Sequence, residues 1–142
     1  MDKKKDFASK LRTSGLRPTK QRIKLAEFLF NREKTFHFTV ENLDKAINKK
    51  NSEDKIALAT IYNTVHAFKK AGHLKEILIK EGKNYFDTNT TSHHHFYDEI
   101  NNELTDIENN KIELKKFPTP PKGKSIKDVN VIINIDNDNQ KH

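Results

Sequence analysis

The sequence predicts an α+β protein built from an N-terminal winged helix-turn-helix domain and a small C-terminal α/β dimerisation domain. Three observations predict this fold. Amphipathic segments with helical spacing fill the first half of the chain, a hairpin pattern follows them, and short β-rich segments around a Pro-rich connector make up the rest. We expect the first domain to span 1–87, a polar hinge 88–92, and the second domain 93–142.

Composition limits the class of protein. The 142 residues can bury a core without disulfides, and hydrophobic and charged residues each make up 33%. There is no apolar run long enough for a membrane span, and no hydrophobic signal-peptide core follows the basic N-terminus. The chain has no cysteine, which removes thiolate chemistry and zinc–thiolate sites. We therefore expect a cytoplasmic protein without membrane contacts.

Positive charge is concentrated in the front of the chain. Residues 1–87 carry 20 Lys and Arg against 11 Asp and Glu, whereas residues 88–142 carry 7 against 9. A basic domain of this kind is suited to a polyanion, and double-stranded DNA is the expected partner.

Two helices are predicted before residue 31. Phe7 and Leu11 lie one turn apart in a lysine-rich helix that Ser14-Gly15 ends, and Thr19 can cap a second helix after Pro18. Exposed amides at the start of the second helix favour anions, and basic side chains gather there. The residues expected to hold DNA phosphate there are Arg17, Thr19, Lys20 and Arg22.

A third helix opens at Thr39 after a connector, and a fourth spans residues 57–72. The fourth is expected to bury a stripe of Leu58, Ile61, Val65 and Phe68. Its opposite face offers an amide, a phenol, a hydroxyl and an imidazole, which suits the floor of a DNA major groove. Ala57 at its N-cap offers no side-chain cap. The predicted reading face consists of Ala59, Thr60, Tyr62, Asn63, His66 and Lys70.

Two strands around a Glu81-Gly82 turn would form the wing, with Lys83 near its tip over the DNA backbone. Beyond the hinge we expect two short strands around Asn101-Asn102 and a last strand over 129–135. These strands leave much of one hydrophobic face uncovered. A homodimer through residues after about His93 is the expected solution.

The histidine run predicts a ligand site. In an extended segment, His93 and His95 share one face and His94 points to the other. Two imidazoles with a nearby carboxylate suit zinc, manganese or ferrous iron. Haem, with imidazole as axial ligand, is an alternative, and so are three exposed histidines that bind nothing. The carboxylates near in sequence are Asp87, Asp98, Glu99, Glu103 and Asp106. His73 is expected to be a helix C-terminal histidine that the helix dipole favours.

The segments LRPTKQR, LATIYNTVHAFKKAG, EGKNYFDT and SHHHF, in this order, resemble the ferric uptake regulator family of winged-helix repressors. The HHHF run, the missing cysteines and the late PTPP connector are most similar to its iron response regulator branch, which senses haem. In that branch haem relieves DNA binding, and the same sign is expected here.

The resemblance implies site residues position by position. It matches Tyr62 to the family's base-reading tyrosine and Arg17 to its minor-groove arm. The haem-binding run would be His93, His94 and His95. The family's inter-domain metal site would fall on His37, Asp87, His93, His95 and Asp106.

These observations together predict a dimeric, sequence-specific transcriptional regulator of iron or haem homeostasis. A divalent metal (Fe, Mn or Zn), or haem, at the hinge would set the separation of the two reading helices. No Gly-rich loop or activated nucleophile accompanies the histidines, so an enzyme such as a metal-dependent nuclease is not expected. A metal-responsive family member without haem sensing and, less directly, a metal-storage protein are the alternatives.

Overall fold

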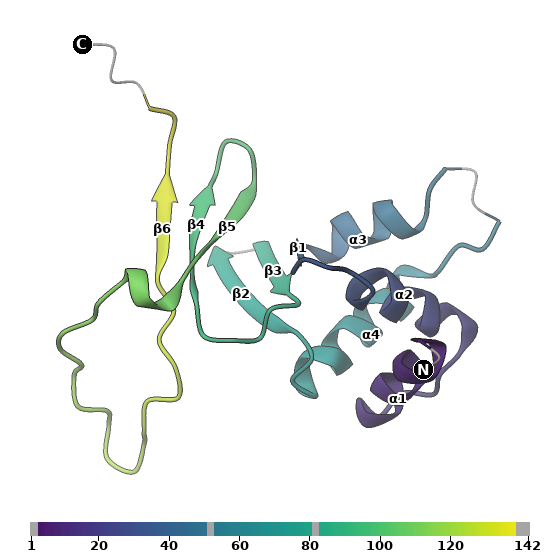
Figure 1. Ribbon diagram of the computed structural model, residues 1–142, viewed down its shortest axis with the longest axis horizontal. Helices are drawn as coiled ribbons and strands as arrows, with labels where there is room; N and C mark the ends of the chain where they lie inside the picture. Colours follow the sequence, from purple (N-terminus) through teal and green to yellow (C-terminus); the bar gives the residue numbers. More distant parts are fainter. Residues whose placement is uncertain (1–2, 51–52, 81–82, 139–142) are drawn as a thin grey trace. The chain divides into compact units, whose positions relative to one another are not determined.

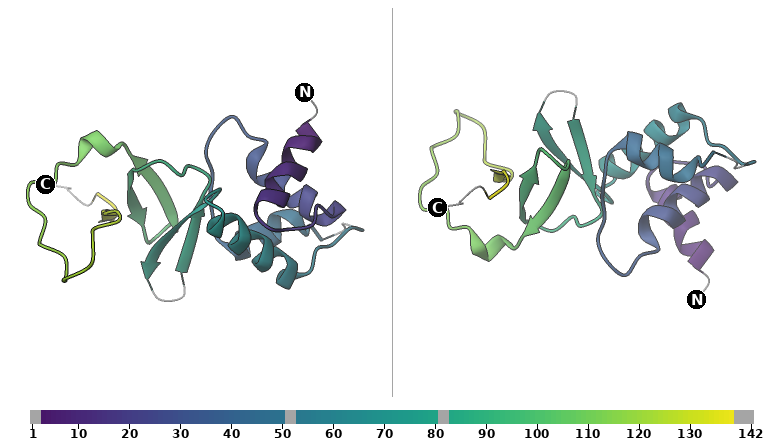
Figure 2. Two further views of the ribbon diagram at one scale, coloured as in Figure 1. Left: turned by 90° about the horizontal axis from the view of Figure 1, so that it is seen from below. Right: turned by 90° about the horizontal axis from the view of Figure 1, so that it is seen from above.

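The computed structural model describes residues 3–50, 53–80 and 83–138. The chain forms two compact units, Met1–Thr90 and Thr91–His142. The division falls inside the segment 88–92 that the sequence marks as a polar hinge. Figures 1 and 2 show that the first unit holds the α-helices together with a small sheet, and that the second is built on strands. No described helix has the length and apolar character needed to cross a bilayer.

The first two helices begin and end where their sequence signals lie. Helix α1 spans Lys3–Thr13 and α2 spans Lys20–Phe30. Gly15 has φ +77° after α1, and the N–H of Leu16 donates to the carbonyl of Leu11 at 2.9 Å. This is the Schellman ending that a left-handed glycine permits. Thr19 caps α2, its hydroxyl accepting from the backbone N–H of Arg22 at 3.2 Å.

Helix α3, Val40–Ile47, starts at a complete capping box. The Thr39 hydroxyl accepts from the Asn42 N–H at 3.0 Å, and the Asn42 side chain accepts from the Thr39 N–H at 3.3 Å. The connector to the next helix is closed by Asn48. Its amide donates to the Ile56 carbonyl, and its carbonyl accepts from the Ile56 N–H, both at 2.7 Å. These two hydrogen bonds fix the chain just before the next helix begins.

Helix α4, Leu58–Lys70, starts at Ala57 without a side-chain cap, as the sequence predicts, and ends at Gly72 with φ +87°. The predicted buried stripe is wrong at one position. Leu58 is 47% exposed, because it lies in the first turn, and Thr64 is fully buried in the stripe. The Thr64 hydroxyl donates to the Thr60 carbonyl at 2.7 Å, which lets a threonine enter the core without an unpaired hydroxyl.

A three-stranded antiparallel sheet completes the first unit. Strands β2, Lys75–Lys80, and β3, Lys83–Asp87, form the predicted hairpin, and β1, His37–Phe38, pairs with the other edge of β3. The sequence analysis assigned β1 to a connector, since two residues show no periodicity. The predicted Glu81-Gly82 turn lies outside the described residues.

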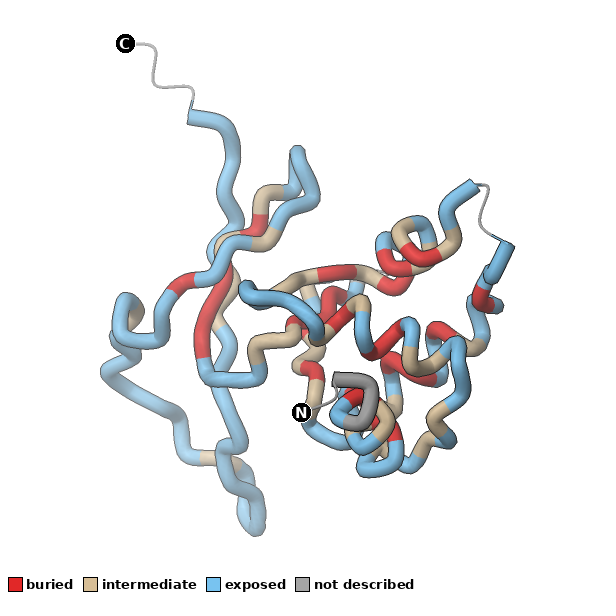
Figure 3. Tube along the Cα trace, turned by 45° about the vertical axis from the view of Figure 1, so that its right-hand side comes forward, coloured by how far each residue is buried: buried red, intermediate tan, exposed pale blue. Residues whose placement is uncertain are grey.

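The core of the first unit lies between the helices and this sheet. Leu11, Leu25 and Leu29 from α1 and α2 pack with Val65 and Phe68 from α4, each at most 1% exposed. Figure 3 shows buried residues recurring along the helices at helical spacing. This periodic burial is what the apolar spacing predicts.

The second unit is a three-stranded sheet in the order β5-β4-β6. Strands β4, His94–Asp98, and β5, Glu103–Ile107, are antiparallel around Asn102, whose φ is +54°, and β6, Ile132–Ile135, lies parallel to β4. The last strand is shorter than the predicted 129–135. Among the described residues of this unit, the helical part is one 3-10 turn, η1, Asn109–Lys111. The buried hydrophobic side chains here are Tyr97 and Ile107, so among the described residues this unit has a small core.

Candidate functional site

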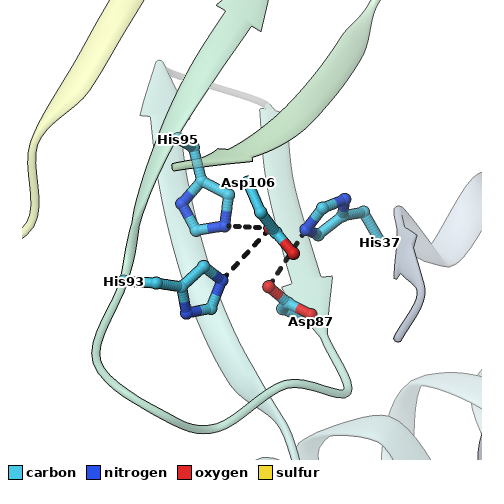
Figure 4. A group of neighbouring side chains, drawn as sticks. All are labelled: His37, Asp87, His93, His95 and Asp106. Carbon is cyan, nitrogen blue, oxygen red and sulfur yellow. Dashed lines mark hydrogen bonds and ion pairs between the residues drawn. The ribbon is translucent and has the colours of Figure 1, made fainter. Parts of the chain in front are cut away.

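Two histidines and one aspartate meet on one face of the second sheet. In the β4–β5 register His95 lies opposite Asp106, and His93 precedes His95 on the same face. The Nε2 atoms of His93 and His95 lie 3.2 and 3.3 Å from the same oxygen, Asp106 Oδ1. Figure 4 shows both rings turned toward this carboxylate. The strand register thus selects Asp106 from the carboxylates that the sequence left open.

A hydrogen bond to the backbone fixes the orientation of the His93 ring. Its Nδ1 lies 2.7 Å from the carbonyl oxygen of Thr91, which can only accept, so Nδ1 is a donor and Nε2 is the nitrogen that faces Asp106. A histidine whose far nitrogen donates to a backbone carbonyl is the usual arrangement of a metal ligand. Both rings are buried, 5% exposed at His93 and 2% at His95. We name His93, His95 and Asp106 the triad.

A second pair lies in the first unit. His37 and Asp87 face each other in the β1–β3 register, with Nε2 and Oδ2 3.0 Å apart (Figure 4). Asp87 is completely buried, and its other oxygen accepts from the Asn89 N–H at 2.8 Å. A buried carboxylate needs a partner of this kind, because its charge loses hydration. The five residues of the predicted metal site thus form two groups, each inside one unit.

His94 has a different role from its neighbours. It is 4% exposed, and its Nδ1 accepts the backbone N–H of Val131 at 3.0 Å. This bond holds the chain at the start of β6 against β4. No sequence signal predicts this bond, because a backbone donor 37 positions away carries no signature.

The donor set fits a divalent metal. Imidazole nitrogens with carboxylate oxygens and no sulfur suit zinc, manganese or ferrous iron. In the triad the ligand atoms lie within 4.8 Å of one another, and the Nδ1 hydrogen bond of His93 leaves its Nε2 as the nitrogen for the ion. The described part of the chain therefore holds side chains that can bind such an ion with little rearrangement.

The predicted reading face of α4 is open to solvent. Tyr62, Asn63 and His66 are exposed, as are Ala59 and Lys70, whereas Thr60 is half-buried. The Tyr62 hydroxyl donates to Glu41 Oε1 at 3.1 Å, and this bond, with the negative charge of Glu41, raises the pKa of Tyr62. The sequence analysis missed Glu41, since α3 was assigned no place at this face.

Some of the side chains predicted to hold phosphate at the start of α2 make hydrogen bonds within the protein. The Thr19 hydroxyl caps the helix, and Arg22 Nη1 donates to the carbonyl of Arg17 at 3.2 Å, which fixes the Arg17 backbone. Arg22 Nε is buried and has no hydrogen-bond partner in the described part of the chain. Lys20 is exposed, 4.0 Å from Asp54. The side chain of Lys83 lies outside the described residues.

His73 differs from its prediction. It follows α4, and its Nε2 lies 3.3 Å from the Thr13 hydroxyl of α1. Burial first, and the nearby charge of Lys10 second, lower the pKa of His73. The neutral ring packs edge-on against Phe30 and Phe68 at 6.5 and 6.0 Å between ring centres. Burial at this contact therefore acts against the protonated form that the helix dipole was expected to favour.

A helical unit with a three-stranded sheet, followed by a β-rich unit, makes this chain a two-domain α+β protein. The ferric uptake regulator of Pseudomonas aeruginosa with manganese has this fold, with a TM-score of 0.65 and 22% identity over 92% of this chain and 97% of that chain. The Vibrio cholerae ferric uptake regulator also has it, with a TM-score of 0.65 and 18% identity over 91% and 98%. These structures confirm the predicted fold class.

The model of the ferric uptake regulator family matches residues 13–134, and the chain belongs to this family. The peroxide-responsive repressor PerR of Staphylococcus epidermidis is 32% identical over 97 residues, 68% of this chain and 62% of that protein. The peroxide operon regulator of Bacillus subtilis is 31% identical over 91 residues, 64% and 60%. The chain thus spans about three fifths of the length of these relatives. The family predicted from the sequence is confirmed, and the iron response regulator branch stays a prediction.

Proposed function

We propose that this protein is a dimeric, metal-responsive regulator of transcription that binds specific DNA sequences. The observation that carries the proposal is the triad, in which two buried histidines present Nε2 to one carboxylate and one of them has its tautomer fixed by the Thr91 carbonyl. Family membership and the basic front half support the DNA-binding part.

The metal would act as a link between the two units. His37 and Asp87 belong to the first unit, the triad belongs to the second, and all five offer ligands of the same kind. An ion bound by both groups would restrict the hinge, and in a dimer the hinge sets the spacing of the two reading helices. The ion can select a geometry only if it binds that geometry more tightly than the other.

The DNA surface in this proposal is the exposed face of α4 with the start of α2 and the wing. Asn63 would read base edges and Tyr62 would contact thymine methyl groups, while the lysines hold phosphate. Phosphate contacts give affinity and salt dependence, and base contacts give sequence preference. The residues assigned to this surface are Arg17, Thr19, Lys20, Arg22, Ala59, Thr60, Tyr62, Asn63, His66, Lys70 and Lys83.

We also propose which chemical signal changes the metal at this site. Relatives of this chain bear the names of peroxide-responsive regulators. These 142 residues contain no cysteine and one methionine, at position 1, so a peroxide response could not run through a thiol of this chain. We propose that ferrous iron at the five-residue site would supply the reducing centre with which peroxide reacts, and that manganese at the same site would not respond.

The haem-sensing function of the iron response regulator branch is the second candidate. It rests on the run His93, His94 and His95. The contacts of the run favour a divalent ion, because His93 and His95 face Asp106 while His94 bonds to the Val131 N–H. Haem ligation through His94 Nδ1 would need that bond to break.

One experiment tests the proposal. DNA duplexes are first selected from a random pool with the manganese-loaded protein, and anisotropy then gives the DNA Kd with metal-stripped, Mn(II)-, anaerobic Fe(II)- and haem-treated protein. We expect Mn(II) and Fe(II) to tighten DNA binding, and peroxide to reverse the Fe(II) effect alone. Haem uptake seen as a Soret band, coupled to DNA affinity, would instead establish the second candidate.

Matched variants connect the effect to the site. Asp106→Asn should weaken Mn(II) binding by about tenfold or more, since it removes the carboxylate that both histidines face. Glu103→Gln, an exposed carboxylate on the same strand, is the control and should bind Mn(II) like the parent. No selectable DNA, or a DNA Kd that no metal changes, would contradict the regulator. Metal uptake without DNA binding would favour a metal-storage protein.

A further inference from the structure

The strand pair β1–β3 carries ligands on one face and aromatic rings on the other. His37 pairs with Asp87, and the next pair in register is Phe38 with Phe86. Successive side chains of a strand point to opposite faces, so any shift of the ligand pair also shifts the aromatic pair. Among the described residues, two residue pairs form this ladder and two hydrogen bonds between Phe36 and Thr88 extend it, so a small number of bonds holds β1 to β3.

The aromatic pair also contacts α4, the helix that carries the predicted reading face. Phe38 and Phe86 are stacked with ring centres 5.7 Å apart, and Phe86 meets His66 edge to face at 5.8 Å. His66 in turn stacks on Tyr62 at 6.1 Å and an angle of 10°. We name Phe38, Phe86, His66 and Tyr62 the aromatic relay. It runs from the strand pair to the side chain matched to base reading, entirely within the first unit.

The far end of the relay has room to move. Phe38 and Phe86 are 1% and 2% exposed, whereas His66 and Tyr62 lie at the surface. A cleft of about 250 Å³ adjoins them. Tyr62 is held there by its hydrogen bond to Glu41, which DNA contact through the phenol would have to replace. The cleft is lined by Val40, Glu41, Tyr62, His66, Asn84 and Phe86.

We infer that His66 is a positioning residue, which couples the state of the His37–Asp87 pair to Tyr62 through ring packing on Phe86. This inference rests on the proposed function, since it concerns how metal at that site changes DNA affinity. Metal that fixes β1 against β3 fixes Phe86, and His66 then holds the Tyr62 ring in one orientation. A coupling of this kind acts in both directions, so DNA must raise metal affinity by the same factor.

The test separates coupling from simple DNA contact. The measured quantity is the ratio of the DNA Kd without metal to the Kd with Mn(II), using the selected duplex. Couplings between two sites are typically about 5- to 150-fold. His66→Ala, which removes the ring from an exposed position, should bring the ratio below about a third of the parent value. His66→Phe keeps a ring and should retain at least half of it.

Asn63→Ala is the matched control, because Asn63 is exposed on the same helix and has no place in the relay. It should weaken DNA binding with and without metal to the same extent and leave the ratio unchanged. His66→Ala would overturn the inference if it behaved like Asn63→Ala, with a weaker Kd and an unchanged ratio. If His66→Phe lowered the ratio as much as His66→Ala does, the inference would also be overturned, since ring packing would then not be the cause.

Failure of the proposed function gives a different result. If the unaltered protein shows a ratio near one, metal does not control DNA binding, and the proposed function and this inference fall together. If the parent ratio is large and both His66 variants keep it, the proposed function stands and the inference is wrong. Mn(II) affinity measured with and without the duplex must shift by the parent ratio, which checks the reciprocity.

Discussion

Replacing Asn48 tests how the helix-turn-helix is held together. Its side chain makes three hydrogen bonds of 2.7 Å: one to Asp44 and two to the backbone of Ile56. A hydrogen bond contributes about 1 kcal/mol net, and an unpaired buried group costs more. Ile56 is 2% exposed, so water cannot readily replace the lost partners. Asn48→Ala should therefore lower the free energy of unfolding by about 3 kcal/mol.

The assay is urea unfolding followed by circular dichroism at 222 nm. The described α-helices all lie in the first unit, so this signal reports its unfolding. The backbone amide of Ile56 should also exchange its hydrogen faster, since it loses its acceptor. Asn63→Ala, an exposed asparagine inside a helix, is the control and should change stability by less than about 0.5 kcal/mol. A change equally small in Asn48→Ala would refute the assigned role.

Two further predictions concern the end of α4. Gly72→Ala should cost about 1 kcal/mol in the same assay, because alanine is strained at φ +87° although no atom lies within 4 Å of the added carbon. Unchanged stability would mean that the helix end can relax. Since burial and Lys10 lower the pKa of His73 in the folded state, the unfolded chain binds the proton better, and stability must fall as the pH drops from about 7 to about 5. His73→Gln should lose less stability over this range, and an equally steep loss would contradict the contact.

The helices could be predicted because their signals are local. Thr19 and Thr39 cap where the sequence predicts, and Gly15 and Gly72 end helices in left-handed conformations. Strand β1 could not be predicted, because two residues form a strand only when a distant edge is there to pair with them. Leu58 was wrongly predicted to be buried, because helical periodicity does not show that the first turn of α4 extends beyond the elements packed against it.

Some residues of the candidate site could be predicted from the sequence and others could not. Alternation placed His93 and His95 on one face, but five carboxylates were near in sequence, Asp106 not the nearest, and only the β4–β5 register selects it. His37 lies 50 positions from Asp87 and was reached through family resemblance alone. The Thr91 carbonyl behind His93 had no signal, because every residue has a carbonyl.

The parallel pairing of β4 with β6 has a consequence for the order of folding. It joins residues 37 positions apart, and the connection between β5 and β6 contains only a 3-10 turn among its described elements. Closing such a contact costs loop entropy, and the chain must extend as far as β6 before the second sheet can be completed. During synthesis the whole of the first unit is made before β6 is available to pair with β4. The DNA surface of the proposed regulator would then be synthesised before β6 can complete the sheet that carries the triad.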